Sequence, residues 1–260
     1  MTRSLFIIAG ASFVLALACL GGAAALGGRD LAANDWTWVI SDREAGPDDH
    51  VSFERGDLGP DVTRTLDWNG GETLTVDLSA DVAYVQGDKP GVVIRGPKSA
   101  VERVRLVGGR LTLADSDDYA ERVFIRWGPT GIHGWSESER LKITVTAPAV
   151  DSFRVAASGD LTVEGYDRPT LDIRLDGSGD VEVDGKAGKL DLRINGSGDA
   201  ELDGLEVTDV NIDIAGSGET HVGPTGAAVV NISGSGDVTF TRRPKSVQQD
   251  ISGSGDVEGV

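Results

Sequence analysis

Six acidic residues recur at a nearly constant spacing in the second half of the chain. Each follows an Ala-Ser-Gly or Gly-Ser-Gly triplet, and they are Asp160, Asp180, Asp199, Glu219, Asp237 and Asp256. Stacked carboxylates could bind Ca²⁺, which prefers oxygen ligands. The calcium-binding β-roll, however, repeats about every nine residues, whereas these acids are 18 to 20 residues apart. We therefore expect the carboxylates to accept backbone N–H hydrogen bonds in tight glycine turns, with neither a metal nor a cofactor.

A row of arginines is the second periodic feature. Arg154, Arg174 and Arg193 stand three residues before the triplet, and Asp172 and Asp191 stand two residues earlier still. β-Helical polysaccharide lyases also use arginine and carboxylate groups in an outer groove, so a carbohydrate-active enzyme is one alternative. In later repeats the arginine position holds Asp213, Asn231 and Asp250. Because the row is not continued, we expect ion pairs on a solvent-exposed face and keep the three arginines as candidate binding residues.

The least repetitive part of the chain is an insertion over residues 115–140, which contains Trp127 and Trp135. These tryptophans are candidate binding residues for an envelope protein or a glycan; in the alternative, they cap an end of the repeat. The three histidines are scattered along the chain, at His50, His133 and His221. This distribution supports neither a zinc site nor an acid–base relay, so no catalytic residue is expected.

The residues on both sides of each acid alternate between apolar and polar, which is typical of half-buried β-strands. Leu171, Ile173 and Leu175 show this alternation before one triplet, and Val181 and Val183 show it after the acid. One such unit cannot bury its apolar face alone, so copies must stack. The predicted fold is therefore all-β, a parallel β-solenoid (β-helix) with coils of about 19 residues.

These patterns divide the chain into parts. The predicted solenoid domain covers residues 61–260, with regular coils over 151–260 and irregular coils over 61–150, which contain the insertion. In the irregular part, Ser79–Gly87 copies the motif and its short strand. Residues 29–60 are polar and rich in turn residues, so we expect a tether or a partly ordered cap there.

Residues 1–28 have the composition of an export signal, because Arg3 precedes an uncharged apolar run that ends in small residues. Cleavage after Ala25 fits the preference for small residues at such sites. The run is also long enough to remain as a membrane-anchoring helix, and Cys19 faintly resembles the lipidated cysteine of bacterial lipoproteins. All three alternatives place the rest of the chain in the extracytoplasmic envelope, either in the periplasm or at the cell surface. They also limit membrane contact to this segment.

The overall composition excludes three further classes of protein. The chain has 260 residues, of which 42 are acidic and 24 basic, so its formal net charge is −18. Binding to nucleic acid requires a basic face, so we expect no nucleic acid partner. A single cysteine can form neither a disulfide framework nor a cysteine-rich zinc domain.

The repeat and its flanks resemble the family described as "putative auto-transporter adhesin, head GIN domain". The resemblance covers roughly residues 65–260. It rests on Arg64–Gly87, on Arg140–Val155 and on the iterated Gly-Ser-Gly-Asp corners. It implies a β-solenoid in an exported bacterial envelope protein, with no known catalysis.

The expected function is that of a structural or adhesin-like interaction module of the cell envelope. A calcium-stabilised adhesive rod and a carbohydrate-active β-helix enzyme are the alternatives. Val260 follows the last corner closely, which predicts an open strand edge. Open edges pair readily with other strands, so we also expect self-association through the C-terminal end of the solenoid.

Overall fold

The structure is a computed structural model that describes residues 36–41, 52–55, 60–114, 122–128, 131–136 and 138–259. The signal or anchor helix expected over residues 1–28 lies outside these residues. Within the described ranges, no helix is long and apolar enough to cross a membrane. The chain divides into two compact units, residues 58–117 with 137–260 and residues 1–57 with 118–136.

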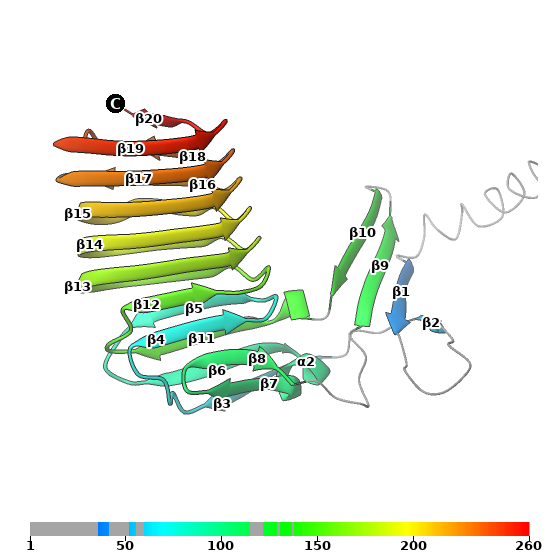
Figure 1. The fold of residues 1–260 in the computed structure, drawn as a ribbon. Coiled ribbons are helices and arrows are strands. Elements are labelled where there is room, and N and C mark those ends of the chain that lie inside the picture. The colour runs from blue at the N-terminus through cyan, green and yellow to red at the C-terminus, as the bar shows by residue number, and fades with distance from the viewer. Residues whose placement is uncertain are drawn as a thin grey trace, which may run out of the picture. The chain divides into compact units, whose positions relative to one another are not determined.

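The larger unit contains a β-solenoid of about five turns, which confirms the all-β solenoid predicted from the repeat. Its coils are stacked in chain order from β12 to β20 (Figure 1). The strands are β12 (Ser152–Val155), β13 (Leu161–Gly177), β14 (Val181–Gly196), β15 (Ala200–Gly216), β16 (Glu219–Pro224), β17 (Ala227–Gly234), β18 (Asp237–Phe240), β19 (Ser246–Gly253) and β20 (Val257–Gly259). All of these strands pair in parallel with their neighbours. On one side of the solenoid, the first halves of β13, β14 and β15 pair side by side, and β16, β18 and β20 extend this row of strands. On the other side, the second halves of the same three strands pair, and β17 and β19 extend that row.

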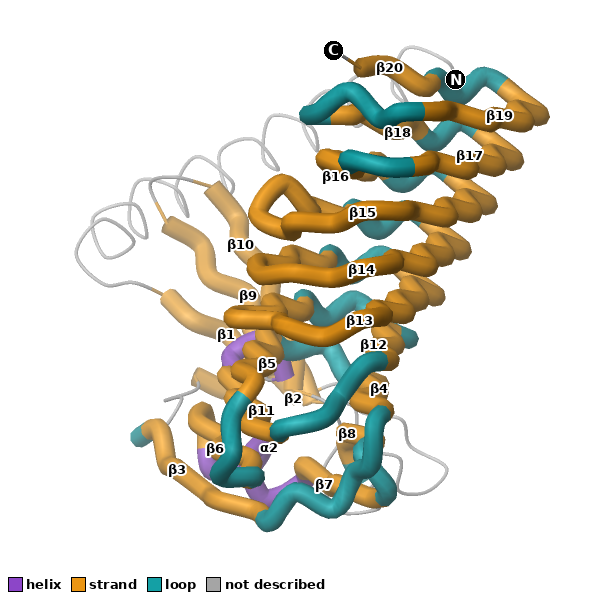
Figure 2. Tube along the Cα trace, turned by 90° about the vertical axis from the view of Figure 1, so that its left-hand side faces the viewer, coloured by secondary structure: helices purple, strands orange, loops and turns teal. Residues whose placement is uncertain are grey.

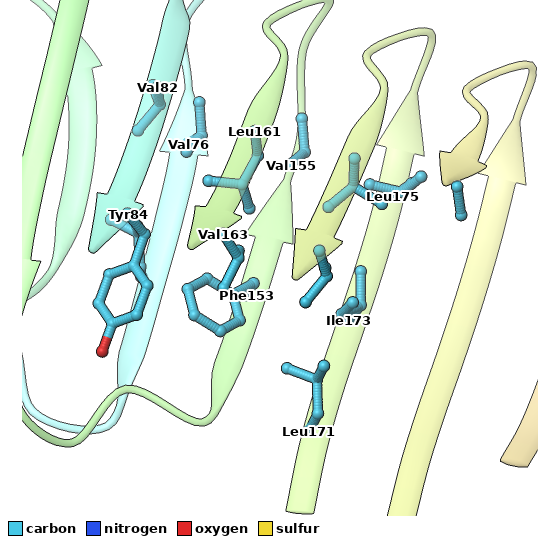
Figure 3. Close-up of a cluster of buried hydrophobic side chains, with 14 of the residues drawn as sticks. Val76, Val82, Tyr84, Phe153, Val155, Leu161, Val163, Leu171, Ile173 and Leu175 are labelled. Atoms are coloured by element: carbon cyan, nitrogen blue, oxygen red, sulfur yellow. The ribbon is translucent and has the colours of Figure 1, made fainter. Parts of the chain in front are cut away.

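Alternation along each strand decides which side chains enter the core. In β13, Leu171 and Ile173 are buried, whereas Asp172 between them is turned toward the surface. Figure 3 shows Leu171 and Ile173 in the interior together with Leu161 and Val163 of the same coil. Fully burying one leucine, isoleucine or valine contributes about 1.5–3 kcal/mol. Stacking the coils therefore supplies the stability that a single coil lacks.

The Gly-Ser-Gly-Asp motif forms one corner of each coil, where the backbones of successive coils touch. A Cβ atom on Gly198 would lie 2.2 Å from the carbonyl oxygen of Gly179 in the preceding coil. On Gly196 it would lie 2.0 Å from the carbonyl oxygen of Gly177, and Gly196 has a φ of 145°. The Ser197 N–H group donates to the same Gly177 oxygen at 3.0 Å. Glycine is required at both positions, because a side chain would push the coils apart.

Residues 60–114 differ from the parallel coils that the sequence predicts there. The elements of this part and of the chain that returns to it are β3 (Asp61–Leu66), β4 (Thr73–Asp77), β5 (Asp81–Gln86), β6 (Gly91–Pro97), α2 (Lys98–Arg103), β7 (Val104–Val107), β8 (Arg110–Leu113), a 3₁₀ turn (Ser138–Arg140) and β11 (Lys142–Ala147). β6 is antiparallel to both β3 and β11, and β7 is antiparallel to β8. Gly108 and Gly109, with φ of 57° and 80°, form the tight turn between β7 and β8.

Parallel pairing joins this irregular part to the regular coils. β5 pairs with β11 and with β13, and β4 pairs with β12. α2 packs on β3 and β6 and buries Ala100 and Val101. In Figure 2, β3, β6, β7 and α2 lie at the end of the solenoid opposite β20. The N-terminal end of the solenoid is therefore covered by a helix and antiparallel strands.

The smaller unit contains a four-stranded antiparallel sheet in the order β10-β9-β1-β2. Its strands are β1 (Trp36–Ser41), β2 (Ser52–Arg55), β9 (Arg122–Gly128) and β10 (Gly131–Ser136). β1 and β2 belong to the interval 29–60, for which the sequence predicts a tether or cap, and β9 and β10 belong to the insertion. The two intervals thus contribute to one sheet.

Candidate functional site

The corner acids form a hydrogen-bonded row along one edge of the solenoid. In each of four bonds, an aspartate Oδ1 atom accepts the backbone N–H of the acid in the next coil. The bonds are Asp160 to Asp180 at 3.1 Å, Asp180 to Asp199 at 2.9 Å, Asp199 to Glu219 at 2.7 Å and Asp237 to Asp256 at 2.8 Å. The sequence predicts donors within the acid's own turn, and Asp256 does accept the N–H of Val257 at 2.8 Å. In the four bonds above, however, the donor belongs to the following coil. The carboxylates therefore link coils to one another.

Glu219 interrupts this row. Its longer side chain points to the imidazole of His221, with Oε1 at 2.9 Å from Nε2. The N–H of Asp237, which would be the next donor, instead bonds to the carbonyl oxygen of Gly218 at 3.3 Å. One added methylene is enough to move the carboxylate away from the corner.

The outer side of β13, β14 and β15 next to this row carries many carboxylates. We call it the acidic face, and it consists of Asp160, Glu164, Asp180, Glu182, Asp184, Asp199, Glu201 and Asp203. The register places Glu182 directly beside Glu201. In the described part of the chain, none of these eight carboxylates forms an ion pair with a basic side chain. An open groove of about 540 Å³ crosses the face, and Lys142 is the one base among its lining residues.

The predicted arginine row lies on the other side of the solenoid. Arg154, Arg174 and Arg193 are direct neighbours on β12, β13 and β14. The Arg193 guanidinium is 3.6 Å from the Asp172 carboxylate and 3.8 Å from that of Asp213. Arg174 is 3.4 Å from the aspartate two residues further along its own strand. Arg154 is exposed and has no carboxylate partner in the described part of the chain. Exposed pairs of this kind add only about 0–1 kcal/mol each, so the row contributes little to stability.

Arg174 and Arg193 of the arginine row also line an open groove of about 390 Å³, which we call the polar groove after its polar lining residues. Its polar lining residues are Arg174, Arg193, Asn195, Asp213, Asn231, Ser233, Asp250 and Ser252. The Asn195 side-chain amide donates to Asp176 at 2.7 Å, and that of Asn231 donates to Asp213 at 2.7 Å. These contacts hold the amides in place, and their oxygens and the serine hydroxyls are groups that hydrogen-bond sugar hydroxyls. The sequence indicated the arginines of this groove but not its asparagines and serines.

The two predicted tryptophans belong to the smaller unit. Trp127 of β9 pairs with Ile132 of β10 and with Trp36 of β1, whereas Trp135 pairs with Phe124. The register therefore does not place Trp127 and Trp135 opposite each other. They remain a sequence-based prediction of a binding surface.

The sequence did not predict that three aromatic residues pack together in the core. The rings of Tyr84 and Phe153 are 5.0 Å apart and those of Phe153 and Tyr166 are 6.2 Å apart, both edge to face. The Tyr84 hydroxyl donates to the Ala147 carbonyl at 2.7 Å, and the Tyr166 hydroxyl donates to the carbonyl of Thr170. Burial raises the pKa of both hydroxyls above its usual value. These groups are neutral structural elements.

Metal binding gains no support from the arrangement of side chains. Among the described residues, no group of three or more histidine, cysteine, aspartate or glutamate side chains is arranged to hold a metal ion. The oxygens of the corner acids face backbone N–H groups instead, as the four bonds above show.

The model of the family described as "Putative auto-transporter adhesin, head GIN domain" matches residues 72–258, which include the regular coils as far as Glu258 in β20. No curated protein matches the chain.

Crystal structures of putative adhesins from two bacteria are among the solved structures that match this chain. A crystal structure of a putative adhesin from Bacteroides fragilis is 18% identical, with a TM-score of 0.58, and the match covers 77% of this chain and 97% of that one. A putative adhesin from Parabacteroides merdae is 16% identical, with a TM-score of 0.42, and the match covers 78% of this chain and 97% of that one. At this identity the first likeness shows a shared fold.

Proposed function

Because this chain belongs to the family described as "Putative auto-transporter adhesin, head GIN domain", we propose that it is an exported cell-envelope protein that acts as an adhesin-like interaction module. Membership of this family suggests an extracellular or envelope location. The apolar segment at residues 5–28 supports export by a signal or an anchor. We propose no catalytic step.

The observation that carries this proposal is the arrangement of the outward side chains in rows. Arg154, Arg174 and Arg193 repeat from coil to coil at the strand spacing of about 4.8 Å. Both grooves are open and follow such rows across several strands. A repeating surface of this kind suits an extended partner, whereas catalysis requires reactive groups that converge on one point.

The polar groove is the proposed contact surface, and an envelope glycan is the proposed partner. Its amides, hydroxyls and guanidinium groups can hydrogen-bond the hydroxyls of a sugar chain. Arg154 continues the row and, having no carboxylate partner among the described residues, can pair with an acidic sugar. The acidic face, in contrast, consists of carboxylates, and Lys142 is the one base that lines the groove across it. This face would therefore repel an anionic glycan.

Binding to isolated envelope polysaccharide tests the contact surface. We expect the full chain to co-sediment with it and the Arg193→Ala/Asn231→Ala variant to bind about tenfold more weakly, because two hydrogen-bonding groups are lost. Glu201→Gln on the acidic face is the matched control and should bind like the unchanged protein. Equal binding of all three proteins would overturn the polar groove as the contact surface, and no binding by any of them would overturn the glycan as partner.

Two further measurements test location and the absence of catalysis. If the protein is at the cell surface, protease added to intact cells should cleave it. If it is periplasmic, protease should cleave it only after the outer membrane has been permeabilised. Protection that persists in spheroplasts would contradict export. Turnover of polysaccharide by the purified protein, abolished by Arg174→Ala, would establish the carbohydrate-active enzyme instead.

A further inference from the structure

The C-terminal end of the solenoid exposes apolar side chains of its last coil. β19 pairs with β17, and no other described strand pairs with it. Val247 on β19 is 47% exposed, and Ile251 and Val257 are only partly buried. An open depression of about 500 Å³, lined by Val247, Val257 and Phe240 among others, lies at this end. The apolar interior is thus accessible from this side.

Gln249 stands where earlier coils bury an apolar residue. The register aligns this position with Val230, Ile212, Leu192 and Ile173 in the preceding coils. Gln249 is exposed in the structure. An amide that becomes covered needs hydrogen-bond partners, because an unsatisfied one costs about 1–3 kcal/mol. Any partner that covers this end must therefore offer a donor and an acceptor opposite Gln249.

At the other end of the solenoid the covering elements bury their own apolar side chains: Ala100, Val101 and Val104 of α2 and β7 are at most 1% exposed. Val107 is exposed there, at the turn that ends β7. A head-to-tail contact would set the open apolar end of one copy against this closed end. The matching surface is the same end of a second copy, because a two-fold interface uses one patch twice.

We propose that two copies of this chain associate tail to tail, with β19 of each pairing antiparallel to the other about a two-fold axis at Gln249. Each Gln249 amide then faces the Gln249 amide of the other copy, and primary amides can donate hydrogen bonds to each other and accept them from each other. In this register Val247 faces the partner's Ile251, so the exposed apolar residues cover one another. Inward positions remain inward because these residues alternate along the strand.

The charges around β19 fit this antiparallel arrangement. Arg242, Arg243 and Lys245 precede the strand, and none of them forms an ion pair in the part of the chain that the structure describes. Asp256 follows the strand at the last corner. Antiparallel pairing about Gln249 sets Ser246, at the start of β19, opposite the partner's Ser252. The basic residues before the strand then lie near the partner's last corner, and the symmetry repeats this arrangement. A basic cluster in a chain of net charge −18 thus meets the partner's acidic corner.

Sedimentation velocity over a range of concentrations tests the association. We expect the full chain to form dimers and Val247→Lys to weaken them about tenfold or more, because a charge would enter the apolar contact. Val107→Lys is the matched control, because Val107 on β7 is also a large exposed apolar residue, with 72% of its surface exposed. It should leave the dimer unchanged, and the apolar N-terminal segment is common to all three proteins. Monomers at every concentration, or equal dimers in both variants, would overturn the proposal.

Cross-linking through engineered cysteines tests the register. Directly opposite residues of an antiparallel pair have Cα atoms about 4.5–5.5 Å apart, within the range of about 4.4–6.8 Å that a disulfide spans. In a Cys19→Ser background, Gln249→Cys should therefore form a disulfide-linked dimer on mild oxidation. Gln248→Cys is the control and should cross-link much less, because the partner's Asp250 faces it. Equal cross-linking of both variants, or none by Gln249→Cys, would refute the two-fold axis at Gln249.

Discussion

The two corners of each coil are built in different ways. At the Gly-Ser-Gly-Asp corner, main-chain atoms of one coil touch main-chain atoms of the next, as at Gly198 and Gly179. At the opposite corner, the main-chain contacts differ from coil to coil, as at Gly185 beside Tyr166, and side chains make further contacts. There the Tyr166 hydroxyl bonds to a carbonyl of its own turn, and Lys186 Nζ lies 3.5 Å from the Glu206 carboxylate.

This difference explains why one corner keeps its sequence and the other does not. Main-chain contact leaves no space for a Cβ atom at the second glycine of the motif, and glycine stands there in all six repeats. The irregularities in strand register lie at the opposite corner, between Val163 and Tyr166, between Glu182 and Gly185, and between Leu202 and Val207. The opposite corner therefore absorbs the variation of 18 to 20 residues in coil length.

The largest expected effect comes from adding one methyl group at the first corner. Gly198→Ala would place Cβ 2.2 Å from a carbonyl oxygen and force two coils apart. We expect the free energy of unfolding to fall by about 3 kcal/mol or more. At the opposite corner, Gly165→Ala meets no atom within 4 Å but keeps a φ of 65°. It should cost about 1–2 kcal/mol. Urea denaturation measures both, and equal losses would contradict the difference between the corners.

Tyr166→Phe tests how far the opposite corner depends on side-chain bonds. We expect a loss of about 1.5 kcal/mol, because the substitution leaves a carbonyl without its donor. Burial raises the hydroxyl pKa in the folded protein above the value of 10.0 in a model compound. The folded state therefore holds its proton where the unfolded state releases it, so stability is full below pH 10 and falls as the pH rises above it.

Denaturation as a function of pH measures this contribution. The variant should lose less stability than the unchanged protein between pH 10 and 11, while Tyr84 retains its own share of the effect. If the free energy of unfolding falls equally between pH 10 and 11 in both proteins, Tyr166 does not contribute to this pH dependence.

Removing one corner carboxylate should have a moderate effect. Asp180→Ala takes away the acceptor of the Asp199 N–H group, and we expect a loss of about 1 kcal/mol because this exposed donor can turn to water. Asp180→Asn keeps an acceptor oxygen and should lose about half as much or less. If Asp180→Asn loses as much stability as Asp180→Ala, the charge of the carboxylate, rather than its hydrogen bond, matters at the corner.

The smallest expected effect is a gain. Glu219→Asp shortens the side chain so that it can accept the Asp237 N–H, as the other corner acids do in their coils. It gives up the exposed contact with His221, which is worth little. We expect thermal denaturation to show a stabilisation of about 0.5 kcal/mol. No gain would mean that the Gly218 carbonyl already satisfies this donor.

The regular coils could be predicted because each repeats the same local pattern in the chain. A constant step aligns Arg154, Arg174 and Arg193 without any knowledge of distant contacts. The hydrogen bonds of the corner acids were harder to foresee, because their donors lie about one coil away. The polar groove was missed for a similar reason, since Asn231 and Ser252 acquire meaning only when the coils are stacked.

Pairing between distant segments limited the prediction for the first half. Asp81 precedes Asp160 by about four repeat lengths in sequence, yet β5 lies directly beside β13 in space. The sequence does carry a signal for the antiparallel hairpin at Gly108–Gly109, because two glycines between apolar strands favour such a turn. No comparable local signal joins β1 to β9, which are separated by about 80 residues.

Main-chain stacking at the corner has a consequence for the evolution of this protein. Duplication of one repeat would give the new coil the same glycine neighbours below and above that every other coil has. The solenoid could thus be lengthened or shortened in whole steps of about 4.8 Å without redesign of the remaining coils. Between relatives, the distance that such a module spans in the envelope can therefore change by recombination within the gene, while the surface that each coil presents stays the same.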